Sequence, residues 1–577
     1  MLPRLTFFTG ALPVIYLTFL VLRYAVPIPV LDDWEMTPLV VKAQEGTLRL
    51  YDLFEQQQEA RTFFPKILFI LFAAVGGHWD GRVEMIFSIF ICCLTALGIL
   101  FLLRKALLSG LAKPVAFLLM VLLIFSPVQQ ELWLLASGFP SFLPALCLVW
   151  GIWVICTRIS VAAKFWICLA VAVFSSFSLA NGLLAWGLTF PLLFVLQRVP
   201  GWKKWLGGWF LACAICSAIY FWEFKPQDEL PTFAPAVSPL AYLQYLLAFL
   251  GSGLARAGNE HPLAASTAVG AVLLAGYLGS VIYSVFRRHD RKYCERILPW
   301  LALGAYSIGS GCLAALGRIG WGVSQALESR YVPFSLYLIV AMIALVAIFA
   351  GEVRQARGGF LARRLVFASV VFLSAGYLVL ELMCAAASVP LLRMRSAEIR
   401  LGQGAVLFSQ VMDTSDTIRS ANYPRPTVVR QRANLLDRLH LLRTPLIRTK
   451  EISKLRRADV DEKFAAGWFD GLVKSDESHL VAWGWAAFPG KGRSADSVVL
   501  AYADERGEWI AFAASDAVLS RPDVAENLKN PEQRWTGWRV VFTRDAIPKG
   551  AKLSAWAVDA KAAKLYRLKT TEQALNF

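Results

Sequence analysis

Long runs of apolar residues, separated by short polar loops, fill the first two thirds of the chain. Most runs approach or exceed the roughly 20 residues that an α-helix needs to cross the hydrocarbon of a bilayer. The first extends from about Leu5 to Val26, and we expect it to remain as an uncleaved helix because no small-residue cleavage site follows it. The pattern predicts about eleven crossings. The others are centred at 83–103, 112–126, 139–157, 164–179, 182–197, 205–222, 264–286, 297–316, 331–350 and 365–388.

Two further apolar stretches, 63–77 and 238–256, have an ambiguous pattern, and the charge of the loops decides how we interpret them. Lys and Arg mark cytoplasmic loops. The basic loops fall on one side only if both stretches lie in the interface or re-enter without crossing. This arrangement predicts a cytoplasmic N-terminus and an acidic outer face. The basic residues are Arg104, Lys105 and Lys113; Arg158 and Lys164; Arg198, Lys203 and Lys204; Arg287, Arg288, Arg291, Lys292 and Arg296; Arg354, Arg357, Arg363 and Arg364.

The pattern changes after Val389, where the hydropathy falls. Residues 390–463 are polar and basic with helical spacing, which predicts a juxtamembrane linker. From 464 to 577 short runs alternate between apolar and polar residues, as in Leu480–Ala486, Ser497–Tyr502 and Leu553–Val558. This spacing predicts a small antiparallel β-sandwich of about 110 residues. The expected fold is therefore a polytopic helical membrane domain (1–389), followed by the linker and an extracytoplasmic β-sandwich. The C-terminus is expected in the periplasm.

The composition supports a membrane protein and argues against nucleic-acid binding, disulfide bonds and a structural zinc site. The chain is 57% hydrophobic and only 17% charged, with a mean hydropathy of +0.53. Its net charge of +17 follows from the basic loops more simply than from nucleic-acid binding, which we do not expect. The ten cysteines lie in or beside apolar runs, and the five histidines lack ligand spacing. Neither a disulfide framework nor a structural zinc site is predicted.

Acidic residues gather in the loop that follows the first span. Asp32, Asp33 and Glu35 come directly after the apolar run, where hydrocarbon gives way to water. Further along, Asp52, Glu55 and Glu59 would share one face of a helix by their spacing. The simpler interpretation is that these acids belong to a solvated loop at the end of a helix. The alternative is that they carry out acid–base catalysis at the membrane surface.

Three later segments add polar groups at outer helix ends. They are Ser126–Trp133, with Gln130 and Glu131; Asn181–Gly182; and Gly317–Tyr331, with Arg318, Arg330 and Tyr331. Taken singly, each is more often a turn or an anchor than a site. The outer arginines Arg61, Arg318 and Arg330 run against the charge pattern, and guanidinium groups match phosphate oxygens bidentately. Salt bridges to the neighbouring acids explain each of them equally well.

These residues resemble the membrane glycosyltransferases of the bacterial GT-C superfamily over about residues 1–390. The resemblance is carried by the Asp32-Asp33 pair, by Glu59-Ala60-Arg61, and by the Gly317-Arg318 to Ser329-Arg330-Tyr331 loop. It implies inverting transfer of a hexose or pentose from a polyprenyl phosphate to an envelope glycan or protein, on the outer face of the bacterial inner membrane.

The same resemblance assigns roles to residues. Asp32 or Asp33 would be the base, and Glu59 would contact the acceptor or a metal. Arg61, Arg318 and Arg330 would hold the lipid phosphate, and Lys66 would assist or extend to the interface. Further substrate contacts would come from Glu35, Gln130, Glu131, Asn181 and Tyr331. No metal-ligand set is assigned, although adjacent acids suit a weak divalent cation, Mg²⁺ or Mn²⁺.

The β-domain is rich in tryptophan, which allows two interpretations. Indoles stack on sugar rings, so carbohydrate binding is one hypothesis, but we expect most of them to fill the core. They are Trp468, Trp483, Trp485, Trp509, Trp535, Trp538 and Trp556. For the whole chain, a transporter or flippase of a lipid-linked sugar and a non-catalytic anchor for the β-domain stay as alternatives to the transferase.

Overall fold

The computed structural model divides the chain into two compact units. Unit 1 consists of Met1–Ala25, Leu48–Leu71 and Arg82–Arg393; unit 2 consists of Val26–Thr47, Phe72–Gly81 and Met394–Phe577. Part of the first polar loop therefore groups with the linker and the β-domain. The structure describes residues 2–107, 112–196, 199–225, 237–256, 259–355, 360–455, 457–458, 467–488, 493–515, 517–560, 562 and 564–570.

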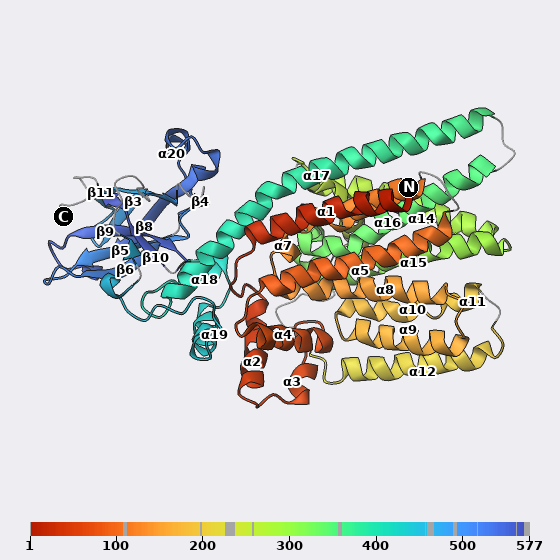
Figure 1. The fold of residues 1–577 in the computed structure, drawn as a ribbon, viewed down its shortest axis with the longest axis horizontal. Helices are drawn as coiled ribbons and strands as arrows, with labels where there is room; N and C mark the ends of the chain where they lie inside the picture. The colour runs from red at the N-terminus through yellow and green to blue at the C-terminus, as the bar shows by residue number, and fades with distance from the viewer. Residues whose placement is uncertain are drawn as a thin grey trace. The chain divides into compact units, whose positions relative to one another are not determined.

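Unit 1 is helical, and α5, α8, α9 and α12 lie side by side in it (Figure 1). Short 3-10 helices connect several of its elements. The α-helices are α1 (Leu2–Tyr24), α3 (Leu50–Phe54), α4 (Phe63–Gly76), α5 (Arg82–Ala106), α6 (Ala112–Ile124), α7 (Gln130–Trp133), α8 (Leu143–Ile155), α9 (Val161–Ser176), α10 (Ala185–Leu188), α11 (Leu192–Leu196), α12 (Trp202–Phe221), α13 (Pro239–Ala255), α14 (Pro262–Phe286), α15 (Arg291–Arg318), α16 (Val332–Gln355) and α17 (Phe360–Phe408). The 3-10 helices are η1 (Pro127–Gln129), η2 (Ala136–Phe142), η3 (Ala180–Leu184), η4 (Ile319–Trp321), η5 (Val323–Leu327) and η6 (Ser329–Tyr331).

Eight helices of the described residues are long and apolar enough to cross a membrane, fewer than the eleven crossings predicted. They begin at Arg82, Ala112, Ala136, Trp202, Pro262, Arg291, Ser329 and Arg364. The described part of α1, helix α9 and the segment 180–196 are apolar but shorter, as are α4 and α13, the two ambiguous stretches.

The predicted span at 182–197 falls among the shorter apolar segments, and its described part, 182–196, is interrupted. It folds as η3, α10 and α11 in succession, with a bend at Thr189. Pro191 follows the bend, where it lacks an N–H for a helical hydrogen bond and clashes with the preceding turn.

Helices α13 and α14 approach each other closely, because two glycines face the opposite backbone. A Cβ on Gly251 would lie 2.0 Å from the carbonyl oxygen of Ser266, and one on Gly270 would lie 1.8 Å from that of Leu247. Small residues let helix backbones touch in this way. The contact holds the C-terminal end of α13, which leads into Arg256.

Unit 2 combines short helices of the first loop and the linker with a β-sandwich. Its helices are α2 (Asp33–Gln44), α18 (Ser415–Ala421), α19 (Pro426–Arg438) and α20 (Pro522–Asn527), with η7 (Ile452–Lys454), η9 (Pro531–Arg534) and η10 (Arg544–Ala546). Helix α17, 49 residues long, continues well past the predicted end of its span at 388. Its final turns carry Phe408, which is buried in unit 2.

Two sheets make the sandwich, and the strands predicted at Leu480–Ala486, Ser497–Tyr502 and Leu553–Val558 are confirmed as β3, β5 and β9. One sheet has the order β1-β10-β9-β5-β6 and the other β11-β2-β3-β8-β7, with β4 beside β3. Most pairs are antiparallel, but β1–β10 and β11–β2 are parallel. The strands are β1 (Arg457–Ala458), β2 (Gly467–Lys474), β3 (His479–Phe488), β4 (Arg493–Ser494), β5 (Ser497–Ala503), β6 (Trp509–Ser515), β7 (Leu519–Ser520), β8 (Trp535–Thr543), β9 (Leu553–Asp559), β10 (Lys564–Arg567) and β11 (Lys569–Thr570).

The tryptophans of this domain are mostly outside the core, so the expectation that most of them fill it is wrong. Only Trp538 and Trp556 are buried, at 1% exposure each. Trp535 is exposed, and the other four are half-buried: Trp468, Trp483, Trp485 and Trp509. The inter-sheet core is built instead from aliphatic side chains and phenylalanines, such as Phe469, Leu480 and Leu500.

Candidate functional site

Arg61 stabilises the loop between α3 and α4 through backbone carbonyls. Its Nε donates to the carbonyl of Tyr220 at 2.6 Å, its Nη1 to that of Phe54 at 2.6 Å, and its Nη2 to that of Trp222. The side chain is buried. Because a guanidinium has five N–H donors, most of those of Arg61 are engaged. This geometry gives the residue a structural role.

Lys66 has a similar position at the start of α4. Its Nζ donates to the carbonyls of Glu55 at 2.6 Å and Asp52 at 3.2 Å. Burial lowers the pKa of Lys66 to about 8, the nearby charge of Arg61 lowers it as well, and Glu55 and Asp52 act against the shift. Arg61 and Lys66 together hold the loop that presents Glu59.

Glu59 and Arg318 form an ion pair between this loop and the end of α15. Arg318 Nη2 donates to Glu59 Oε2 at 2.8 Å, and its guanidinium lies 5.1 Å from the ring centre of Trp321. The other carboxylate oxygen, Glu59 Oε1, is buried and has no hydrogen-bond partner within the described residues. Arg318 therefore fixes the carboxylate of Glu59 through Oε2, and Oε1 accepts no hydrogen bond from the described residues.

Arg330 and Glu131 form a second pair, between η6 and α7. Arg330 Nη1 lies 3.7 Å from Glu131 Oε1, and Ser329 Oγ donates to Glu131 Oε2 at 3.4 Å. The Arg330 guanidinium lies 5.6 Å from the ring centre of Tyr331. The α7 turn is fixed by Trp133, which is fully buried and donates from Nε1 to the carbonyl of Ser126 at 2.9 Å.

A third arginine, Arg256, belongs to the same group and was missed by the sequence analysis. Burial lowers its pKa, and the charges of Glu328 and Glu131 oppose that shift. The residue is a lone cation directly after the apolar helix α13, and that position was the signal available in the sequence. We call Glu59, Glu131, Arg256, Arg318, Glu328 and Arg330 the acid–arginine cluster.

The electrostatics of the acid–arginine cluster act on Glu59 in two directions. Burial raises the pKa of Glu59, and the charges of Arg318 and Arg330 act against that rise. The net result is a pKa above the usual carboxyl range. A carboxylate with a raised pKa is a stronger base for a hydroxyl proton than an ordinary one.

Two other predicted residues lie in unit 1. Gln130 begins α7, next to Glu131, and its Oε1 is buried with no hydrogen-bond partner among the described residues. Asn181 is half-buried in η3, and no hydrogen bond between it and the acid–arginine cluster occurs within the part of the chain that the structure describes. Its neighbour Gly182 fits tightly, since a Cβ there would lie 1.8 Å from the carbonyl oxygen of Ser175.

Asp32 and Asp33 lie in unit 2, at the start of α2. Asp33 is buried at 1% exposure, and its Oδ2 accepts the N–H of Val30 at 3.0 Å. Asp32 is half-buried at the N-cap position. Leu31, just before them, has a φ of 48°, a left-handed conformation that is uncommon for a leucine. Asp33 thus shapes this turn, and Asp32 is the more accessible of the two.

Glu35 is held by residues of the linker. Tyr423 donates its hydroxyl to Glu35 Oε1, and Arg432 Nη1 lies 3.1 Å from Oε2. Burial would raise the pKa of Glu35, but the hydrogen bonds from Arg432 and Tyr423 outweigh it and lower the pKa. Trp34 next to it donates from Nε1 to Asn422 Oδ1 at 2.5 Å. These contacts fasten α2 to α18 and α19.

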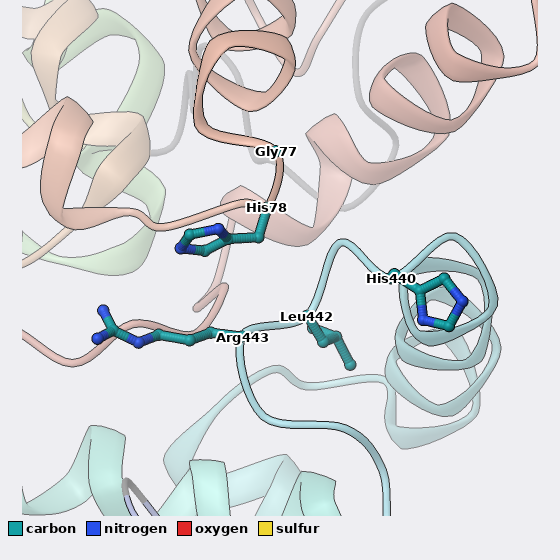
Figure 2. A pocket seen from close by; sticks show the side chains of 5 residues that line it. All are labelled: Gly77, His78, His440, Leu442 and Arg443. Carbon is teal, nitrogen blue, oxygen red and sulfur yellow. The ribbon is translucent and has the colours of Figure 1, made fainter.

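An open pocket of about 460 Å³ also lies in unit 2, and no predicted site residue lines it. Figure 2 shows the side chains of His78 and Arg443 extending in the same direction, whereas that of His440 points elsewhere. Arg443 Nη1 is paired with Asp80 Oδ2 at 2.9 Å. We do not place the chemistry there, because the acids and arginines from which it was predicted lie elsewhere.

The arrangement in unit 1 suits an anion better than a metal cation. Among the described residues no group of three or more His, Cys, Asp or Glu side chains is placed to hold a metal ion. Glu59 and Glu131 each face an arginine instead. The predicted Mg²⁺ or Mn²⁺ does not fit this cluster, and we assign it no step.

Comparison of the chain with protein-family models, with curated proteins and with solved structures gave no match. Its function must therefore be argued from the chemistry of its own residues.

Proposed function

We propose that this chain is a glycosyltransferase of the GT-C type, multi-pass in the bacterial inner membrane, which uses a polyprenyl-phosphate sugar as donor. The observation that supports it is the acid–arginine cluster of unit 1. Glu59 has one oxygen on Arg318 and the other without a protein partner, and Arg330 lies close enough for its charge to act on it. A base beside phosphate-binding groups is what sugar transfer requires.

In the proposed reaction Glu59 Oε1 accepts the proton of an acceptor hydroxyl. The hydroxyl oxygen forms a bond to the anomeric carbon, and the bond from that carbon to the phosphate oxygen breaks on the opposite side, which inverts the configuration. Polyprenyl phosphate leaves with the bonding electron pair. Arg318 and Arg330, with donors beyond those used in their ion pairs, stabilise the charge of the leaving phosphate.

This proposal moves the base from the Asp32-Asp33 pair to Glu59. The reason is that Asp33 is engaged in its own turn, while Glu59 has an oriented oxygen and a raised pKa. Asp32 stays the alternative base, as the resemblance implies. The acceptor in either case is an envelope glycan or a protein.

Mass spectrometry of envelope glycans and polyprenyl-phosphate sugars tests the proposal. Cells carry the wild-type chain, no chain, Glu59→Gln, Asp32→Asn, or the control Glu55→Gln, an exposed acid of the same loop. We expect loss of one sugar from a glycan or protein, with accumulation of its lipid donor, in the deletion and in Glu59→Gln only. Loss in Asp32→Asn alone returns the base to Asp32. Retention in both variants with loss in the deletion contradicts the transferase and favours a flippase or an anchor.

A further inference from the structure

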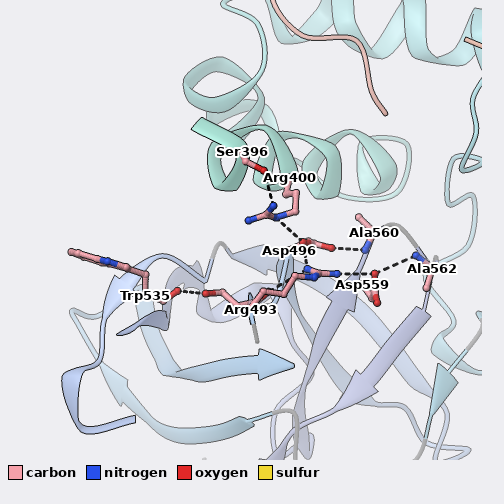
Figure 3. Close-up of polar contacts among 9 residues, drawn as sticks. Ser396, Arg400, Arg493, Asp496, Trp535, Asp559, Ala560 and Ala562 are labelled. Carbon is pink, nitrogen blue, oxygen red and sulfur yellow. Dashed lines mark hydrogen bonds and ion pairs between the residues drawn. The ribbon is translucent and has the colours of Figure 1, made fainter. Parts of the chain in front are cut away.

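The two sheets of the β-sandwich differ in what covers their outer faces. The sheet that contains β5 and β9 is covered by the end of α17 and by the segment before β1, through Phe408, Met412 and Ile452. Arg400 of α17 also pairs with the buried Asp496 at 3.4 Å (Figure 3). Every residue of β9 is accordingly buried.

The outer face of the other sheet carries three half-buried tryptophans. Trp468 of β2 stands directly opposite Trp485 of β3, with ring centres 5.4 Å apart and ring planes inclined by 28°. Trp483 lies two residues from Trp485, on the same face. None of the three belongs to either hydrophobic cluster found in the described part of the domain.

A glycine opposite Trp483 leaves room for its indole over the neighbouring strand. Gly471 is the cross-strand partner of Trp483, and a Cβ there would stand 2.4 Å from the indole ring. Gly537 of β8 is the partner of Trp485 on its other side. Trp483 therefore covers Gly471, whereas Trp468 and Trp485 stack on each other. We call these three half-buried rings, Trp468, Trp483 and Trp485, the aromatic platform.

Charged groups with fixed geometry border the platform. Arg521 Nη1 donates to Asp470 Oδ2 at 2.7 Å, and the Arg521 side chain covers Gly537, since a Cβ there would lie 2.9 Å from Arg521 Cγ. Lys569 Nζ lies 5.2 Å from the ring centre of Trp468. Arg521 also pairs with Asp523 at 2.8 Å, so its guanidinium is held in place beside the rings.

We infer that the aromatic platform, with Asp470, Arg521 and Lys569, is a binding surface for an oligosaccharide. The C–H face of a sugar ring stacks on a flat indole, and its hydroxyls accept from guanidinium and ammonium groups and donate to carboxylates. The inference concerns binding alone and does not rest on sugar transfer by unit 1.

The test uses the full chain in detergent and a panel of soluble hexasaccharides of glucose, mannose, galactose, arabinose and N-acetylglucosamine. Saturation-transfer NMR and tryptophan fluorescence report binding. We expect at least one member to bind the wild type. The double variant Trp468→Ala/Trp485→Ala should bind it about tenfold more weakly or worse, because two stacking contacts are lost.

Trp509→Ala is the matched control, since Trp509 is also half-buried beneath a cation, Arg567, but lies on the other sheet. It should leave the affinity unchanged. Near-ultraviolet circular dichroism verifies that each variant is folded, and Trp485→Phe should retain part of the affinity. Absence of binding to every member by the wild type, as expected of a bilayer or protein contact, overturns the inference. Equal weakening by Trp509→Ala also overturns it.

Discussion

Glu59 and Arg318, 259 positions apart in the chain, meet at 2.8 Å. The contact joins the loop after α3 to the end of α15, and it leaves the second oxygen of Glu59 without a protein donor among the described residues. This relationship is the basis of the proposed transfer chemistry, and the first two predictions examine it.

Removing the charge of Glu59 should abolish most of the transfer. We expect Glu59→Gln to reduce the rate by about 10²–10⁴, the usual contribution of general acid–base catalysis. The measurement is the rate of sugar transfer by membranes supplied with the lipid donor that accumulates in deletion cells. Glu55→Gln, with an exposed side chain in the same loop, should leave the rate unchanged. A Glu59→Gln rate within twofold of wild type would remove Glu59 from the mechanism.

The pH dependence of transfer should reflect the raised pKa of Glu59. The base works only when ionised, so the rate should fall as the pH drops through a pKa above the ordinary carboxyl range. Arg318 opposes the rise, so Arg318→Gln should move this acid limb to higher pH. Rate profiles of both proteins between about pH 4 and 8 would show the shift. A limb that moves to lower pH in Arg318→Gln would contradict the assignment.

Substitution of Arg61 should lower the stability of the protein, whereas substitution of Arg330 should lower its activity. Arg61→Gln leaves the carbonyls of Phe54, Tyr220 and Trp222 without their donor. The bond to Tyr220 is buried, and a buried carbonyl left unsatisfied costs about 1–3 kcal/mol. Thermal unfolding of Arg61→Gln in detergent should occur at a clearly lower temperature. Arg330→Gln should unfold near the wild-type temperature but transfer more slowly. If Arg61→Gln is as stable as wild type and inactive, Arg61 contacts substrate as the sequence predicted.

The stability of unit 2 should decrease in acid through Glu35. Its pKa is lowered in the folded state, so the stabilisation is present above the pKa of the unfolded chain and is lost as the pH falls through the folded value. Tyr423→Phe removes one donor and should raise the folded pKa toward its usual range. We expect about 1 kcal/mol less stability at neutral pH and a weaker acid dependence. Unfolding temperatures from about pH 3 to 7 measure both, and an unchanged acid dependence would exclude Glu35 as its source.

The sequence by itself determined where most helices and strands lie. The apolar runs at 83–103 and 331–350 correspond to α5 and α16, and the alternating runs of the β-domain correspond to β3, β5 and β9. These features depend on side chains a few positions apart, which have a period of about 3.6 or 2 residues. The interruption within the span predicted at 182–197 could not be predicted, because a local bend at Thr189 does not change the average hydropathy.

Only the tertiary structure decided what individual polar residues do. Arg61 and Arg318 look alike in sequence, yet Arg61 donates hydrogen bonds to backbone carbonyls and Arg318 donates to Glu59. Trp538 and Trp485 both lie in strands with the same alternating pattern, yet Trp538 is buried in the core and Trp485 is half-buried at the surface. Partners of this kind come from segments far apart in the chain, and their encounter depends on how whole helices and sheets pack, which local periodicity does not specify.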